Sequence, residues 1–182
     1  MDANITKRNE CLAKTVIKGL ESRNMSGYYA ASKEDALKQA LEKGNYNYLD
    51  RSKMSPREGL MAAYDADIFL SSANAITSDG ILVNIDGNSN RVSCIAQGPR
   101  KVVFIVGINK VCSDLDSAMK RARNVAAPVN AQRFDLNIPC KETGKCFDCK
   151  SMDTICCQFL ITRFSRHTDR IHVILVNDTL GY

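Results

Sequence analysis

The feature that most restricts the fold is an uninterrupted apolar run, Val-Val-Phe-Ile-Val, at residues 102–106. A strand with one face in water alternates apolar and polar side chains, whereas a run that is apolar throughout is typical of a strand buried on both faces. Such a strand belongs in the middle of a sheet that is covered by helices. Further strand-like runs lie at residues 28–30, 46–49, 68–70, 81–85, 92–96, 157–162 and 171–176.

Helical periodicity and capping residues predict the helices around this sheet. Leu12, Val16 and Leu20 recur every four residues, which is the spacing of one helix face. Ser55, followed by a proline and then, three residues after the serine, by a glutamate, is typical of a helix start. The expected helices cover residues 5–22, 32–42, 55 onward and 114–127, and Pro128 is expected to end the last of them.

Strands that alternate with helices and then follow one another closely indicate an α/β fold with a mixed, largely parallel sheet flanked by helices. The chain has 182 residues, of which 45% are hydrophobic and 25% charged, enough to bury a full core. We therefore expect a single domain over residues 1–182, with a cysteine-rich loop at residues 139–157.

The charge pattern restricts the partners. The net charge of +5 is scattered along the chain, and no basic stripe with interleaved aromatic residues is present, so we expect no nucleic-acid binding. This charge supports attraction for a small anionic metabolite. No segment provides the roughly 20 apolar residues that span a membrane, and residues 1–4 are polar. We expect a cytoplasmic protein without membrane insertion.

Small polar residues gather at the ends of the expected strands between residues 67 and 90. In open α/β sheets, ligands bind beyond the carboxyl ends of strands. Asn74, Asp86 and Lys110 each follow an expected strand; amide and carboxylate groups can bind a hydroxylated ligand, and a lysine can hold a carboxylate or phosphate. Ordinary turn chemistry is the alternative, because asparagine, aspartate and glycine suit tight turns, and composition alone favours it.

A cysteine cluster is the second feature that can carry chemistry. Five of the eight cysteines fall between residues 140 and 157, and Cys146 and Cys149 form a Cys-x-x-Cys pair that can hold one metal or neighbouring irons. Three nearby lysines are expected to lower the thiol pKa values. Three interpretations are open: a bound metal as an iron–sulfur cluster or zinc, redox-active thiols, or reduced structural cysteines. Disulfides are disfavoured in the cytoplasm.

Short segments along the chain resemble the lactate-utilisation (LUD) domain family. They occur in the family's order and spacing from Ala66 to Tyr182, and the resemblance is weaker in the N-terminal third. The segments include Ala66-Asp67-Ile68-Phe69-Leu70, Asn74-Ala75-Ile76-Thr77, Leu82-Val83-Asn84-Ile85-Asp86-Gly87, Asn90-Arg91-Val92, Val106-Gly107-Ile108-Asn109-Lys110, Pro139-Cys140 and Thr143-Gly144-Lys145-Cys146.

The resemblance implies a fold similar to the superfamily of glucosamine-phosphate deaminase, ribose-phosphate isomerase and CoA-transferase. It further implies a protein of organic-acid (lactate) metabolism. Family members in multi-protein assemblies take part in oxidising L-lactate to pyruvate with iron–sulfur partners. This chain resembles the stand-alone members, for which the resemblance implies no definite activity, so whether it is an enzyme stays open. An iron–sulfur oxidoreductase partner and a homo-oligomer are both compatible with it.

The resemblance and the strand-end positions together name the candidate site residues. Lys110 and Arg91 would anchor a carboxylate or phosphate, and Asp86 or Asp79 is the candidate general base. The candidate ligand-binding residues are Asn74, Asn84, Arg91, Asn109 and Lys110. The family's cysteine pattern corresponds to Cys140, Cys146, Cys149 and Cys156, with Cys157 where the family usually has asparagine.

The chain departs from the family pattern in one place. The family has an additional strand and a glycine- and serine-rich turn between the positions of Ala40 and Asn45, and this turn borders the ligand pocket in related folds. Either the protein lacks one wall of that pocket, or a stretch is missing from this sequence, which an intact mass well above 20.1 kDa would indicate. Two other functions are open: a sugar-phosphate isomerase-like or CoA-transferase-like enzyme, and a non-catalytic redox or metal-binding protein.

Overall fold

The central element of the fold is a four-stranded parallel sheet. The computed structural model describes residues 2–41, 46–50 and 53–182, and the statements below concern these residues. Strand β5 (Lys101–Gly107) lies between β8 (Ile171–Val176) and β2 (Ile68–Ser71), and β1 (Ser26–Ala30) pairs with the far side of β8. The apolar run is therefore an inner strand, as predicted, and its residues Val102, Phe104 and Val106 are fully buried.

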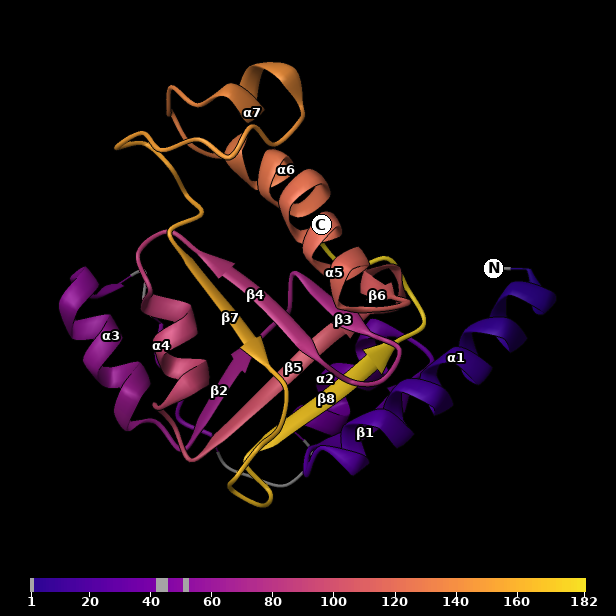
Figure 1. Ribbon diagram of the computed structural model, residues 1–182. Coiled ribbons are helices and arrows are strands. Elements are labelled where there is room, and N and C mark those ends of the chain that lie inside the picture. The colour runs from indigo at the N-terminus through magenta and orange to yellow at the C-terminus, as the bar shows by residue number, and fades with distance from the viewer. Residues whose placement is uncertain (1, 42–45, 51–52) are drawn as a thin grey trace.

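A second, mixed sheet of four strands packs against the first (Figure 1). Strand β4 (Leu82–Asp86) runs antiparallel to both β3 (Ala75–Thr77) and β7 (Gln158–Thr162), and β6 (Val111–Cys112) pairs in parallel with β3. The main core lies between the two sheets, where Phe104 shares one apolar cluster with Ile76 and Leu82. The strands are thus divided between two sheets instead of forming one.

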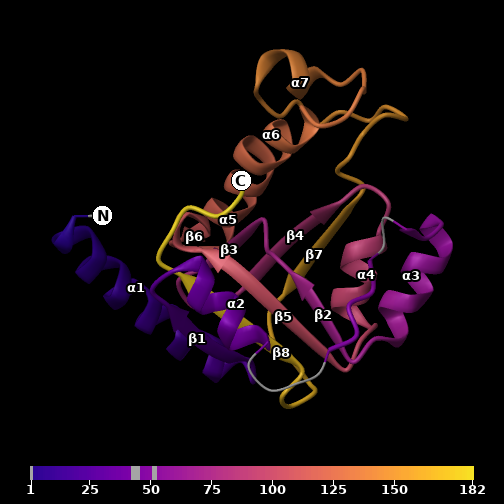
Figure 2. The same ribbon diagram turned by 180° about the vertical axis from the view of Figure 1, so that it is seen from behind.

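Helices cover the remaining faces. Helix α1 (Ala3–Ser22) contributes Ala13, Val16 and Leu20 to the core between the sheets. Helix α2 (Lys33–Leu41) packs Ala36 against β5 and β8 on the opposite face of the parallel sheet (Figure 2). Helices α3 (Pro56–Asp65) and α4 (Asn90–Ala96) contact each other, and α4 also contacts β2. The α/β class expected from the sequence is confirmed.

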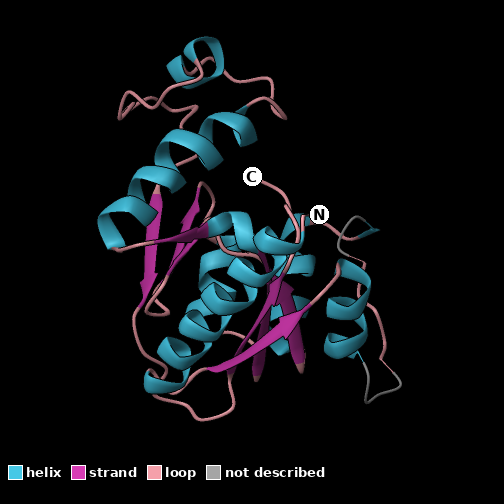
Figure 3. Ribbon diagram, turned by 90° about the vertical axis from the view of Figure 1, so that its right-hand side faces the viewer, coloured by secondary structure: helices cyan, strands magenta, loops and turns pink. Residues whose placement is uncertain are grey.

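A helical rod leads away from both sheets. Helix α5 (Leu115–Arg121), a π-helical turn (η3, Ala122–Ala126) and helix α6 (Ala127–Ala131) follow without a break and carry the cysteine-rich segment, with its short helix α7 (Pro139–Thr143), to one end of the molecule (Figures 1 and 3). The prediction that Pro128 ends the helix is wrong. The Ala127 N–H donates to the Ala122 carbonyl, an i to i−5 bond, and such a wide turn accommodates a proline that has no N–H.

The strand predicted over residues 92–96 is also wrong, because these residues belong to α4. The Asp86 carboxylate precedes the helix, and its Oδ2 accepts the N–H groups of Arg91 at 2.8 Å and Val92 at 3.1 Å. A carboxylate that binds the first N–H groups stabilises a helix start. Val92 and Ile95, three residues apart, then form the buried face of this helix.

Two further expectations concern residues 40–50. The strand predicted over residues 46–49 is wrong, since these residues have no regular structure and Tyr48 is 81% exposed. Residue 42, the expected end of the second helix, lies outside the described residues, as do residues 42–45, where the family's glycine-rich turn is missing.

The short strands β3 and β6, the helical 3-10 turn η2 (Ile108–Lys110) and α7 were not predicted. No helix in the described ranges has the length and apolar character needed to cross a membrane.

Helix α1 approaches the turn before β4 so closely that only glycine fits at the contact. A Cβ atom on Gly19 would lie 2.4 Å from the carbonyl carbon of Asp79. Alanine in a helix is ordinarily more favourable than glycine by up to about 1 kcal/mol. We nevertheless expect Gly19→Ala to lower the free energy of unfolding by about 1–3 kcal/mol, because the backbones must separate.

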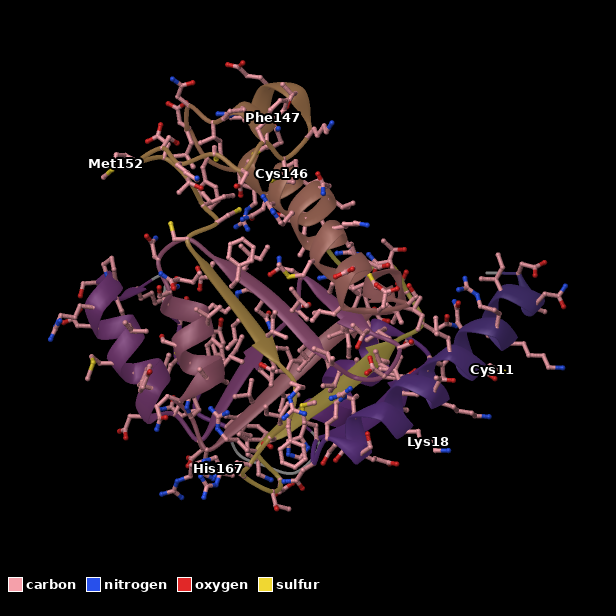
Figure 4. All side chains as sticks on the ribbon, in the orientation of Figure 1. Cys11, Lys18, Cys146, Phe147, Met152 and His167 are labelled. Carbon is pink, nitrogen blue, oxygen red and sulfur yellow. The ribbon has the colours of Figure 1, made fainter. Side chains whose placement is uncertain are left out.

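Urea unfolding of wild type, Gly19→Ala and the neighbouring Lys18→Ala measures this effect. Lys18 points into solvent from the same helix (Figure 4). Lys18→Ala is expected to leave stability unchanged or slightly raised. A Gly19→Ala protein as stable as Lys18→Ala would contradict the close approach.

Candidate functional site

An open cleft of about 1970 Å³ lies beyond the carboxyl ends of β2 and β4, with α6 and the cysteine-rich segment on its other side. This is the position at which open α/β sheets bind ligands. Four of the candidate residues line the cleft, namely Asn74, Asp86, Arg91 and Lys110. The structure therefore brings together residues that lie as far as 36 positions apart in the chain, from Asn74 to Lys110.

Lys110 is the buried cation of the cleft. It follows β5 at the end of the 3-10 turn, and its residue is only 4% exposed. Its Nζ donates to the Ser72 hydroxyl and to the Ala73 carbonyl, both at 3.1 Å. Burial, followed by the positive charges of Arg121 and Arg91, lowers the pKa of Lys110 to about 8. Within the described ranges, no carboxylate forms an ion pair with this lysine.

Arg91 ties the strand ends together. Its Nη1 donates to the Ser72 carbonyl at 2.9 Å and to Asn84 Oδ1 at 3.2 Å. Its Nη2 donates to Asn74 Oδ1 at 2.9 Å and to the Ile85 carbonyl at 2.7 Å. Each of these nitrogens carries two protons, so all four are already bonded to protein oxygens. This guanidinium positions the walls of the cleft and contributes its charge there.

The candidate asparagines hold backbone segments in place around Lys110 and Arg91. Asn74 Oδ1 also accepts the Ile85 N–H at 2.8 Å, which binds the loop after β2 to β4. Asn84 is fully buried behind the cleft, and its Nδ2 has no acceptor among the described residues. Asn109 accepts the Leu180 N–H at 3.3 Å and so holds the last residues near Lys110. The asparagines thus hold the loops in place, as turn residues do, and the same contacts shape the wall of the cleft.

Arg121 is a site residue that sequence reasoning missed. Its Nε donates to the Asn109 carbonyl at 3.2 Å and its Nη1 to the Asn74 carbonyl, so it joins the loops after two strands. It also stands close enough to Lys110 to lower that lysine's pKa. No spacing in the sequence signals this role, because Arg121 lies on α5 and reaches Asn74 and Asn109 only through the packing of that helix on β3.

The two candidate general bases are placed differently. Asp86 lines the cleft, with Oδ2 bonded to the start of α4. Asp79 does not line the cleft; it lies beside α1, where it pairs with Arg23 and accepts a hydrogen bond from Thr77. The hydrogen bond from Thr77, followed by that from Arg23, lowers the pKa of Asp79. Asp79 therefore has a structural partner and lies outside the cleft.

Four of the five clustered cysteines surround a second, smaller cavity of about 40 Å³: Cys140, Cys146, Cys149 and Cys156. The Sγ of Cys146, labelled in Figure 4, accepts the Asp148 N–H at 3.5 Å and lies 3.6 Å from Arg123 Nη2. Cys157 is exposed and outside this cavity, and its Sγ contacts the Thr154 carbonyl at 3.6 Å. The four cysteines of the family pattern therefore line one cavity, and the additional cysteine, Cys157, lies outside it.

The electrostatics of the thiols differ from the sequence expectation. Burial, followed by the other thiols of the cluster, raises the pKa of Cys140 and raises that of Cys156 to about 11. The expected lowering by nearby lysines is wrong for these two, partly because Lys141 donates to the Phe134 carbonyl at 2.7 Å instead. Among the residues that the structure describes, no three His, Cys, Asp or Glu side chains are arranged to hold a metal ion.

The thiol cavity and the large cleft share a wall. Thr154 and Ile155 line both. Thr154 Oγ1 lies 3.5 Å from Cys149 Sγ and accepts the Cys156 N–H at 3.4 Å. Gly87, after β4, approaches this wall so closely that a Cβ there would lie 3.2 Å from the Ile155 Cα. The cysteine-rich segment is therefore a part of the cleft.

Comparisons with known proteins place the chain in a family. The family model described as the LUD domain matches residues 37–176, which is most of the chain. No curated protein matches. Among solved structures, the crystal structure of a DUF162 family protein from Deinococcus radiodurans is similar, with 12% identity, 93% of this chain and 98% of that chain covered, and a TM-score of 0.47. On the strength of the family model, the chain belongs to the LUD domain family.

Proposed function

We propose that this LUD protein binds a small organic-acid anion at the inner end of the cleft, against Lys110, and acts as a subunit or accessory of an organic-acid oxidation system. The observation that carries the proposal is the uncompensated positive charge of Lys110. The functions left open by the sequence, a sugar-phosphate isomerase-like or CoA-transferase-like enzyme and a purely cysteine-based sensor, stay predictions.

The hydrogen bonds of Lys110 leave room for an anion. An ammonium group has three N–H donors, and the described residues supply two acceptors, on Ser72 and Ala73. Burying an ammonium group without a counter-charge costs roughly several kcal/mol, unless an anion neutralises the ammonium group. A carboxylate that accepts the third N–H supplies both the acceptor and the charge. Arg121 and Arg91 add to the positive field at the same place.

Asp86 is the group in the cleft that fits proton transfer. Its Oδ2 is bonded to the start of α4, whereas Oδ1 accepts no hydrogen bond from a described residue. A carboxylate with one free oxygen in a ligand cleft can accept a proton from a bound hydroxy acid. The proposal therefore keeps Asp86 as the candidate base and leaves Asp79 out.

We propose further that Cys140, Cys146, Cys149 and Cys156 hold an iron–sulfur cluster, with zinc as the alternative. Four thiols around one cavity and an N–H donor to Cys146 are the donor set that such a cluster needs. Zinc is held in proteins by the same kind of thiol ligands, so it remains the alternative for this donor set. When bound, an iron–sulfur cluster supplies one-electron transfer.

Loss of the Lys110 charge tests the anion site. We expect Lys110→Met to weaken binding of L-lactate or pyruvate at least about tenfold, since a hydrogen bond to a charged group contributes about 1.5–3 kcal/mol. Calorimetric titration at pH 7 measures the affinity, and Lys18→Met, which removes an exposed lysine, serves as the matched control. Equal affinities in wild type and Lys110→Met would exclude Lys110 as the anion partner.

The pH dependence of binding is the second prediction. Because burial lowers the pKa of Lys110 to about 8, the ammonium form is lost as the pH rises through that value. The affinity for L-lactate should fall roughly tenfold per pH unit above about 8. Lys110→Met should bind weakly with no such slope. An affinity that is constant from pH 7 to 10 in wild type would contradict the assignment.

Anaerobic purification with metal analysis and an absorption spectrum tests the thiol site. We expect iron with acid-labile sulfide and broad visible absorbance, both lost in Cys146→Ser. Cys157→Ser is the matched control and should keep both, because Cys157 lies outside the cavity. One zinc per chain would overturn the iron–sulfur assignment in favour of zinc. A metal-free protein with freely titratable thiols would exclude both.

A further inference from the structure

We propose that Lys110, in its neutral form, is a nucleophile that forms an imine with the carbonyl group of a 2-oxo acid bound in the cleft. The inference rests on the proposed function, since the same cleft must hold the carboxylate of the acid. It goes beyond binding, because it assigns a covalent role to one residue and a carbonyl to the ligand.

The hydrogen bonds of Lys110 suit a neutral amine. An amine has two N–H donors and one lone pair, and its two donors match the Ser72 hydroxyl and the Ala73 carbonyl, each 3.1 Å away. The lone pair then has no protein partner among the described residues. The side chain is held in place by the 3-10 turn between β5 and β6 and lines the cleft. These contacts thus hold Nζ in place, and its lone pair is left to react with a ligand in the cleft.

The surroundings of Lys110 also favour the neutral form. It is the only lysine that is buried in the described part of the chain. The charges of Arg121 and Arg91 oppose its protonation, and no described carboxylate pairs with it to restore the charge. With a pKa of about 8, roughly one side chain in ten is neutral at pH 7. A desolvated lysine beside other cations is a recognised form of activated amine.

The proposed step is balanced within the site. The Nζ lone pair attacks the carbonyl carbon and the carbonyl electron pair moves to oxygen. One of the two nitrogen protons is then transferred to that oxygen, which gives a neutral carbinolamine. A proton taken from solvent converts the hydroxyl group to water, which leaves as the nitrogen lone pair forms the C=N bond, and the nitrogen keeps its remaining proton in the resulting iminium. The Ser72 hydroxyl, 3.1 Å from Nζ, is placed to relay these protons. The iminium keeps one positive charge, which the carboxylate of the acid neutralises.

Reductive trapping tests the inference. The purified chain is incubated with pyruvate and cyanoborohydride, which reduces an iminium to a stable secondary amine. We expect one adduct per chain by intact mass, located at Lys110 by peptide mapping. It should form at least about tenfold faster there than at exposed lysines such as Lys18, because burial lowers the pKa of Lys110 and the Lys110 side chain lines the cleft. An adduct spread evenly over the exposed lysines would overturn the inference.

Calorimetry with L-lactate separates this inference from the function on which it rests. L-lactate carries the carboxylate but has a hydroxyl in place of the carbonyl, so it can bind without forming an imine. Lys110→Arg should keep a positive charge and yield no adduct. Binding of L-lactate to wild type without a Lys110 adduct from pyruvate would overturn the imine and leave the proposed function standing. Absence of both binding and adduct would overturn both.

Discussion

The site depends on the four hydrogen bonds that the Arg91 guanidinium donates. They join the end of β2, through the carbonyl of Ser72, to β4, through the carbonyl of Ile85, and these strands belong to different sheets. The remaining two reach Asn74 and Asn84. Because these bonds are partly buried and charge-assisted, they hold the strand ends in one arrangement. The cleft is the space between those ends and the cysteine-rich segment.

Three cations, Arg91, Lys110 and Arg121, meet at the wall of this cleft, where strands of the two sheets end. All three donate to uncharged oxygens, but Arg91 has the Asp86 carboxylate nearby, whereas the charges close to Lys110 are those of the two arginines, and Lys110 is the most buried of the three. A buried positive charge without a carboxylate is unfavourable in the free protein and becomes favourable when an anion or a neutralising reaction is supplied. This single imbalance supports both the anion site and the reactive amine proposed for Lys110.

The cysteine-rich segment has two roles in one architecture. It gathers four thiols around a small cavity, and through Thr154 and Ile155 it also closes one side of the large cleft. The π-helical turn before α6 allows this placement, because it lets the helical rod continue past Pro128 to the segment. The cavity among the thiols and the large cleft are thus joined by one shared wall.

The sequence by itself determined the α/β class, the inner strand β5, the end of α1, the start of α3, and the grouping of the family's cysteines, because periodicity, capping and short spacing are local signals. Residues 92–96 were wrongly predicted as a strand because a short apolar run suits either element, although the Asp86 carboxylate that begins α4 lies only a few residues before it. Arg121 could not be found, and Asp79 could not be told apart from Asp86, because their contacts join segments distant in the chain. Only the tertiary structure decided which polar residues face the cleft, because that choice depends on how two sheets pack, and no spacing in the chain records it.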